Sequence, residues 1–185
     1  HSQALRVEFD DLATFEHTRC KPLSVLMMVA QKSRRILGFE IASMPAKGRL
    51  ALIAMEKYGP RKDDRPQARA QLFEDMRELI DPKAEIWSDS NPHYTKDVKV
   101  YFPQAQHLTV LGGRSAMTGQ GELKRKKFDP IFSLNHSFAM SRAHINRLIR
   151  KTWCTTKKSD QVAGHLALYA LEHNRRLEHT LRGQF

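Results

Sequence analysis

The sequence predicts an α/β fold in which a mixed five-stranded sheet is flanked by helices and followed by a carboxy-terminal helix pair. Three short apolar or alternating segments fill the first quarter of the chain, helical and strand-like segments then alternate, and two long segments with helical spacing come last. With 185 residues, of which 41% are hydrophobic and 28% charged, the chain can bury a core. It therefore fits one domain, or one domain with an appendage.

The first three elements are strand candidates. Residues 5–11 (LRVEFDD) and 35–43 (RILGFEIAS) alternate apolar and polar positions, and residues 22–30 (PLSVLMMVA) form a continuous apolar run. The basic segment QKSRR, at 31–35, predicts a hairpin turn. The second and third strands are therefore expected to be antiparallel.

Helical spacing begins after the third strand. Residues 49–58 form one helix candidate, and residues 67–80 form a second that Asp81-Pro82 is expected to end. The second helix would present one apolar stripe, made of Ala68, Leu72, Met76 and Leu79.

The later elements alternate again before the final helix pair. Residues 84–89 predict a fourth strand, residues 94–102 a short helix and residues 105–113 a fifth strand. Two amphipathic helices then run from about 132 to 151 and from about 160 to 181. We expect a main domain at 1–151 and a helical extension at 152–185 that packs on it.

This order of elements is that of a ribonuclease-H-like domain, in which the first and fourth strands are neighbours. Asp10 lies near the end of the first predicted strand and Asp89 at the end of the fourth, so we expect the two carboxylates to come close together. Paired carboxylates suit Mg²⁺, which prefers oxygen ligands. Two-metal phosphoryl transfer needs such ligands to hold two ions about 3.5–4 Å apart.

Three segments resemble the catalytic domain of bacterial insertion-element transposases of the insertion-sequence-one type. They are VEFDD at 7–11, WSDSNPHY at 87–94 and the long segment at 144–174 that begins HINRLIRKTW. In this resemblance Asp10 matches the first acid of the family and Asp89 the second, with Asp11 as a fallback for the first. It implies a two-metal Mg²⁺ or Mn²⁺ site, and DNA cleavage and strand transfer at transposon ends.

The resemblance also implies a third metal ligand, a glutamate on a helix, and at this position the chain departs from the family pattern. Counting back without gaps from His144 puts the family's helix-borne glutamate at Asn135, whose amide oxygen can ligate a hard cation but brings no negative charge. The charged alternative is Glu122, between glycines at 119 and 121. We rank Asn135 first because a helix fixes geometry better than a loop, with Glu122 close behind.

Positive charge is concentrated in the carboxy-terminal part of the chain. The net charge is +11, and residues 112–185 carry 14 Lys and Arg against 5 Asp and Glu, compared with 17 against 15 in residues 1–111. Such a distribution favours a polyanionic partner, here double-stranded DNA of transposon ends and target. The phosphate-binding candidates are Lys124, Arg125, Lys126, Lys127, Arg142, Arg147, Arg150, Lys151, Lys157 and Lys158. The resemblance also implies a homodimer acting on paired DNA ends.

The sequence shows no apolar run long enough to cross a bilayer, and its two distant cysteines indicate neither a disulfide framework nor a zinc site. We therefore expect a cytoplasmic protein without a membrane partner. Two alternatives to a transposase remain open: a ribonuclease-H-like nuclease that cuts without joining, and a non-catalytic DNA-binding protein derived from the same fold. The amide at position 135 makes the second alternative credible.

Overall fold

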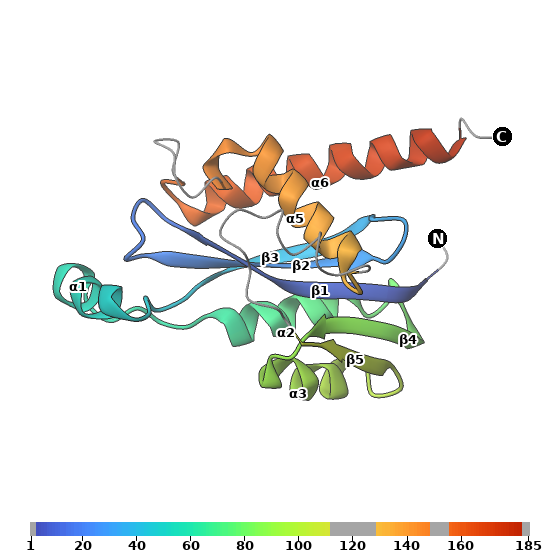
Figure 1. The fold of residues 1–185 in the computed structure, drawn as a ribbon, viewed down its shortest axis with the longest axis horizontal. Coiled ribbons are helices and arrows are strands. Elements are labelled where there is room, and N and C mark those ends of the chain that lie inside the picture. The colour runs from blue at the N-terminus through green and yellow to red at the C-terminus, as the bar shows by residue number, and fades with distance from the viewer. Residues whose placement is uncertain (1–2, 112–128, 149–155, 183–185) are drawn as a thin grey trace.

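The computed structural model describes residues 3–111, 129–148 and 156–182 (Figure 1). The sheet strands are β1 (Ala4–Phe15), β2 (Pro22–Ala30), β3 (Ile36–Ser43), β4 (Ile80–Asp89) and β5 (Gln106–Val110). The helices are α1 (Arg49–Tyr58), α2 (Arg65–Met76), α3 (Pro92–Tyr101), α5 (Phe132–His144), the short 3₁₀ helix η1 (Asn146–Leu148) and α6 (Ser159–Arg182).

The five strands form one mixed sheet in the order β3-β2-β1-β4-β5. The pairs β1 with β2 and β2 with β3 are antiparallel, the second of them as the hairpin at 31–35 predicts. The pairs β1 with β4 and β4 with β5 are parallel. This topology is consistent with a ribonuclease-H-like sheet, so the predicted fold class is confirmed, and the first and fourth strands are neighbours as expected.

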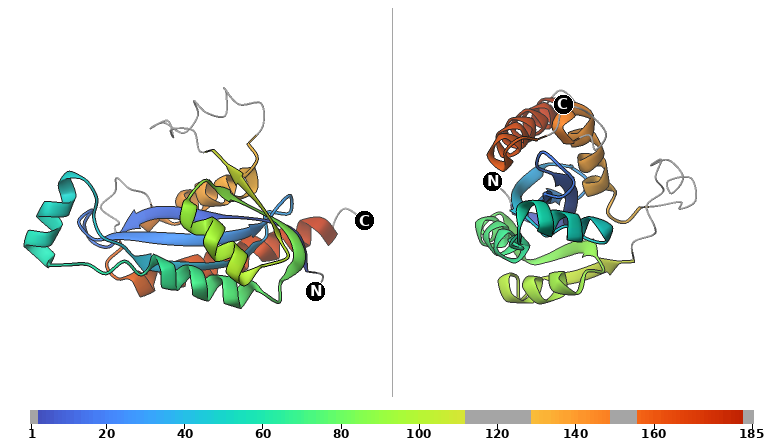
Figure 2. Two further views of the ribbon diagram at one scale, coloured as in Figure 1. Left: turned by 90° about the horizontal axis from the view of Figure 1, so that it is seen from below. Right: turned by 90° about the vertical axis from the view of Figure 1, so that its left-hand side faces the viewer.

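Helices cover both faces of the sheet and create two apolar cores (Figure 1; Figure 2). Successive residues of a strand point to opposite faces, so β1 contributes side chains to both cores. Val7 and Phe9 enter the core beneath α2 and α3, together with Phe73. Leu12 enters the core beneath α5 and α6, together with Leu134. The continuous apolar run of β2 has the same cause, because that strand is covered on both sides.

Helix α6 packs along β3, the edge strand of the sheet. Val162 and Leu166 are fully buried there, and the Asn174 side chain accepts from the Ile36 backbone N–H at 2.9 Å and donates to the Ile36 carbonyl at 2.8 Å. The expected boundary of the extension, at 151 and 152, lies outside the described residues. Although α6 has 24 residues, no helix in the described part of the chain is long and apolar enough to span a bilayer.

The junction between α2 and β4 differs from the prediction. Helix α2 ends at Met76, so Leu79 lies outside it and is 41% exposed. Asp81-Pro82 does not end the helix but lies inside β4, which begins at Ile80. The pairing of β1 with β4 is irregular between Ala4 and Arg6, beside this segment. Such an irregularity tolerates a proline, which cannot donate to the ladder.

The helix predicted at 132–151 is also broken earlier than expected. Helix α5 ends at His144, Ile145 is extended, and η1 follows. Both Ile145 and Leu148 stay buried against the core beneath α6. An unbroken helix would also place Ile145 and Leu148 on the same stripe as Leu134, so the apolar spacing predicts the burial of these side chains but not the break.

Candidate metal centre beside two parallel strands

The sheet brings Asp10 and Asp89 together. The parallel register pairs Glu8 of β1 with Trp87 of β4, and each aspartate lies two residues further along its strand, on the same face as the paired residues. The Cα partner of Asp10 on β2 is Met27, which belongs to the core beneath α5 and α6. The two carboxylates therefore lie at the point where the β1–β4 pairing ends, on the side that α5 and α6 cover. Asp89 is the last residue of β4, as expected, but Asp10 lies inside β1, which continues to Phe15 in its pairing with β2.

Asp10 is the electrostatically unusual member of this pair. Its pKa rises from 3.8 to about 7, first because the carboxyl is buried and then because the negative charge of Asp89 opposes ionisation. Hydrogen bonds from the Asp11 backbone N–H at 2.7 Å and the Tyr94 hydroxyl at 3.2 Å act in the opposite direction. Two carboxylates held close together are a common feature of cation-binding and catalytic sites.

Tyr94 reaches Asp10 from α3. Its side chain is 1% exposed, and its ring packs against Phe9 with the centroids 4.8 Å apart. Burial, together with the nearby negative charges of Asp11, Asp10 and Asp89, raises the pKa of the phenol far above its usual value. Tyr94 is therefore a neutral donor, and its hydroxyl holds Oδ1 of Asp10 in one orientation.

Asp89 combines a turn role with its place beside Asp10. Its Oδ1 accepts from the Asn91 backbone N–H at 2.9 Å, and Asn91 in turn accepts from the His93 backbone N–H at 3.1 Å as the N-cap of α3, with Pro92 in the first turn. The sequence WSDSNPHY thus ends a strand, makes a tight turn and starts the helix that carries Tyr94. This local chemistry fixes both Asp89 and the donor to Asp10.

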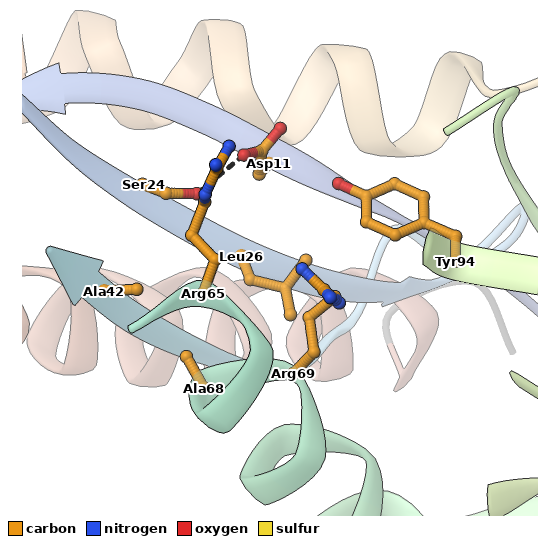
Figure 3. Close-up of a pocket in the computed structure, with 8 residues that line it drawn as sticks. All are labelled: Asp11, Ser24, Leu26, Ala42, Arg65, Ala68, Arg69 and Tyr94. Carbon is orange, nitrogen blue, oxygen red and sulfur yellow. Dashed lines mark hydrogen bonds between the residues drawn. The ribbon is translucent and has the colours of Figure 1, made fainter. Parts of the chain in front are cut away.

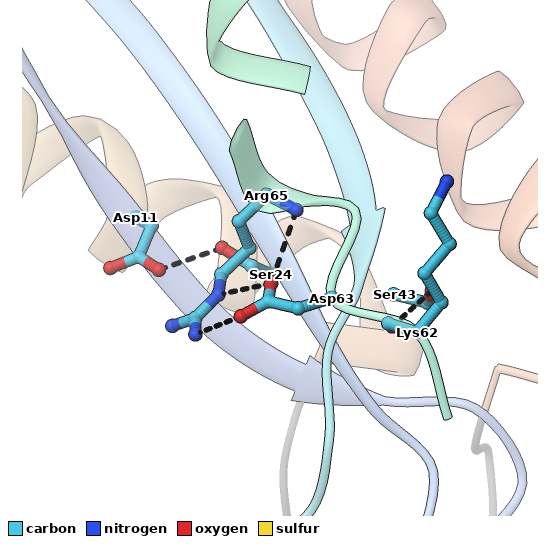
Figure 4. Close-up of polar contacts among 6 residues, drawn as sticks. All are labelled: Asp11, Ser24, Ser43, Lys62, Asp63 and Arg65. Carbon is cyan, nitrogen blue, oxygen red and sulfur yellow. Dashed lines mark hydrogen bonds and ion pairs between the residues drawn. The ribbon is translucent and has the colours of Figure 1, made fainter. Parts of the chain in front are cut away.

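Asp11 lies on the other face of β1. Its Cα partner on β2 is Leu26, in the core beneath α2 and α3, and its Oδ2 accepts from the Ser24 hydroxyl at 2.7 Å. Arg65 lies beside it, held by Asp63 at 2.6 Å (Figure 4). Asp11, Ser24 and Arg65 line a cavity of about 10 Å³ between the sheet and α2 (Figure 3), which is space for roughly one water molecule.

The residue expected to be the third ligand is engaged elsewhere. Asn135 lies on the first turn of α5, is exposed, and donates from its amide to Oδ2 of Asp129 at 2.8 Å. The alternative, Glu122, lies outside the described residues. Within the residues that the structure describes, no three His, Cys, Asp or Glu side chains form a group able to hold a metal. The described part of the site is therefore a pair of carboxylates.

Glu8 is a buried carboxylate that the sequence reasoning missed. It is 1% exposed and accepts from the Leu134 backbone N–H, in the first turn of α5, at 2.8 Å. Because α5 has no side-chain cap from Ile131, Glu8 supplies that cap from β1. Burial raises the pKa of Glu8, and the bond from Leu134 lowers it. A glutamate two residues before Asp10, on the same face of a strand, was the available signal.

Only part of the predicted phosphate-binding set falls within the described residues. Arg142 in α5 and Arg147 in η1 are half-buried, and Lys157 and Lys158 are exposed just before α6. The remaining six residues lie outside the described ranges: Lys124, Arg125, Lys126, Lys127, Arg150 and Lys151. The four described members of this set thus lie in α5, in η1 or just before α6, whose apolar side chains pack on the same face of the sheet as Asp10.

The donor set fits a divalent cation bound by two carboxylates. Burial and mutual repulsion raise the pKa of Asp10, and a cation between the two oxygen donors would relieve that repulsion. The fit is to one ion, since Asn135 adds no charge and bonds to Asp129. Comparison of the chain with protein-family models, with curated proteins and with solved structures finds no significant match.

Proposed function

We propose that this chain is the catalytic domain of a DNA transposase, which cleaves DNA strands and joins them at transposon ends with the help of Mg²⁺ or Mn²⁺. The observation that carries the proposal is the placement of Asp10 and Asp89 on adjacent parallel strands of a ribonuclease-H-like sheet. The raised pKa of Asp10 and the net charge of +11 support it. The resemblance at residues 7–11, 87–94 and 144–174 supplies the reaction class.

In this proposal the residues of the site have three separate roles. Asp10 and Asp89 would hold the divalent ion, which when bound polarises a phosphoryl oxygen and lowers the pKa of a bound water or hydroxyl. Tyr94 keeps one Asp10 oxygen fixed, so that the other is free to face a ligand. Lys157 and Lys158 are exposed and would neutralise DNA phosphates, with a loss of about 0.9 in the log–log salt slope of binding for each contact removed.

One observation favours a second candidate, a non-catalytic DNA-binding protein built on the same fold. The Asn135 amide carries no charge and is bonded to Asp129 rather than left free for a cation. A second metal ion would then have fewer charged ligands, which weakens its binding. In this alternative the chain binds DNA in a salt-sensitive way, and Asp10→Asn leaves that binding unchanged.

The test is a cleavage and joining assay on supercoiled plasmid with a labelled 3′-hydroxyl oligonucleotide, in Mg²⁺ or Mn²⁺. We expect nicking and transfer of the label by the unchanged chain, and loss of at least about a thousandfold in the Asp89→Asn variant. Asp81→Asn, at the other end of β4, is the matched control and should retain activity.

The three outcomes separate the candidate functions. Nicking without transfer of the label would indicate a nuclease. DNA binding with no metal-dependent product would indicate the non-catalytic protein and overturn the transposase proposal. Equal activity in Asp89→Asn and Asp81→Asn would show that the carboxylate pair is not the site of the reaction.

A further inference from the structure

Helix α1 exposes an unusual amount of apolar side chain. Leu52 is 80% exposed, Met55 56% and Ile53 40%, and Ala54 is the buried residue of the helix. The helix projects beyond the end of the sheet (Figure 1; Figure 2). Glycines with positive φ, Gly48 and Gly59, stand at its two ends. A helix this apolar on its outer side indicates an interaction surface.

Four residues of α1 share that outer side. Arg49, Leu52, Ile53 and Glu56 follow the spacing i, i+3, i+4, i+7, which places them on one stripe of a helix. All four are exposed. The opposite side of the helix carries Ala54 and also Tyr58, whose ring lies 4.6 Å from the Lys21 ammonium. The stripe, which we call the α1 stripe, therefore faces away from the body of the protein.

The order of charges along the α1 stripe makes it complementary to itself. Two copies of the helix can pack antiparallel about a two-fold axis that passes between Leu52 and Ile53. Arg49 of the first copy then lies opposite Glu56 of the second, and Glu56 of the first copy lies opposite Arg49 of the second. The apolar pair meets its own copy at the centre. A parallel arrangement would instead place like charges opposite each other, which is unfavourable.

We propose that the α1 stripe is a contact between two copies of this chain, arranged antiparallel. The proposal does not rest on the metal centre or on the proposed function. A helix of 10 residues is about 15 Å long, so the contact is smaller than the interface of about 1,200–2,000 Å² that stable complexes bury. The association is therefore weak and depends on concentration, with a dissociation constant in roughly the micromolar range or above.

Charge-swapped variants of the full chain test this arrangement by sedimentation velocity at low salt. Arg49→Glu alone and Glu56→Arg alone each bring like charges together at both ends, and self-association should fall by roughly tenfold. The double variant restores both pairs and should dimerise like the unchanged chain. Mixing the two single variants should also restore dimers, because each supplies the charges that the other lacks.

The controls separate this contact from other effects. Lys57→Glu changes a charge on the same helix but off the stripe and should leave association unchanged, while Leu52→Ser should abolish it. Thermal melting by circular dichroism should show all variants folded, since the substituted residues are exposed. The proposal is overturned if the unchanged chain stays monomeric at several hundred micromolar, or if neither the double variant nor the mixture recovers dimers.

Discussion

Asp10 and Asp11 are neighbours in sequence, yet they stand in opposite electrostatic environments. Asp11 faces α2, where the Ser24 hydroxyl donates to it and Arg65 lies beside it. Asp10 lies on the side of α5 and α6, where burial and the negative charge of Asp89 raise the pKa of its carboxyl, although the Tyr94 hydroxyl donates to it. One β-strand thus carries a satisfied acid on one face and an acid that resists ionisation on the other.

The difference distinguishes a carboxylate that stabilises the fold from one whose position is better explained by a ligand. An acid matched with a hydroxyl and a nearby guanidinium contributes to folding and needs no ligand. An acid paired with another acid costs stability when both ionise, and such a cost is usually kept because a ligand or a reaction requires it. The following four predictions test this difference, from the largest expected effect to the smallest.

Substituting each aspartate by asparagine should affect cation binding very unequally. Asp10→Asn removes one of two charged ligands and should weaken Mn²⁺ binding by roughly a hundredfold or more. Asp11→Asn should change it by about threefold or less, because its side chain points to the other face. Isothermal titration calorimetry measures both constants. Equal losses would show that the two faces do not differ in the way described.

The stability of the protein should respond to pH through Asp10. Its pKa is 3.8 unfolded and about 7 folded, so the folded state binds the proton more tightly. The stability that this proton contributes is full below about pH 4 and is lost as pH rises through 7.

Denaturant unfolding at several pH values compares the unchanged chain with Asp10→Asn. The variant cannot ionise at this position, so its advantage in unfolding free energy should grow between pH 4 and 7 to the order of a few kcal/mol. Asp11→Asn is the control and should show no such growth. A constant difference between Asp10→Asn and the unchanged chain across this range would contradict the assignment.

Placing a carboxylate at position 135 of α5 should strengthen cation binding on the Asp10 side of the sheet. In Asn135→Glu the side chain loses the amide donor to Asp129 and offers a charged oxygen ligand, so Mn²⁺ affinity should rise by about tenfold or a second ion should bind. Electron paramagnetic resonance of Mn²⁺ counts the ions. Ala143→Glu, exposed at the other end of α5, should have no effect. No gain in Asn135→Glu would remove position 135 from the site.

The smallest effect should come from the hydroxyl of Tyr94. Tyr94→Phe keeps the buried ring but removes the donor to Asp10, so Mn²⁺ affinity should fall a few-fold and stability by about 1 kcal/mol. The pKa of Asp10 should rise further, because a bond to its ionised form is lost. Tyr101→Phe, whose ring packs on Phe73 at 5.9 Å, is the control. Carboxyl NMR titration of Asp10 reads the shift directly.

Several features of the fold could be predicted from local pattern. The alternating and continuous apolar runs located the first three strands, and the helix expected at 94–102 corresponds to α3, which begins two residues earlier, at Pro92. The junctions were less predictable, because a proline can lie in a strand beside an irregular pairing and a helix can end while its apolar spacing continues. These outcomes depend on contacts with distant segments rather than on neighbouring residues.

The sequence by itself determined the order of the elements, the concentration of basic residues after residue 111 and the presence of an acid on each of the first and fourth strands, since periodicity and composition are local properties. Only the tertiary structure decided which of Asp10 and Asp11 faces Asp89, that Glu8 caps α5, and that the α1 stripe is left uncovered. Alternation shows that neighbouring side chains point to opposite faces of a strand. Which helices cover each face is settled by packing across the whole sheet.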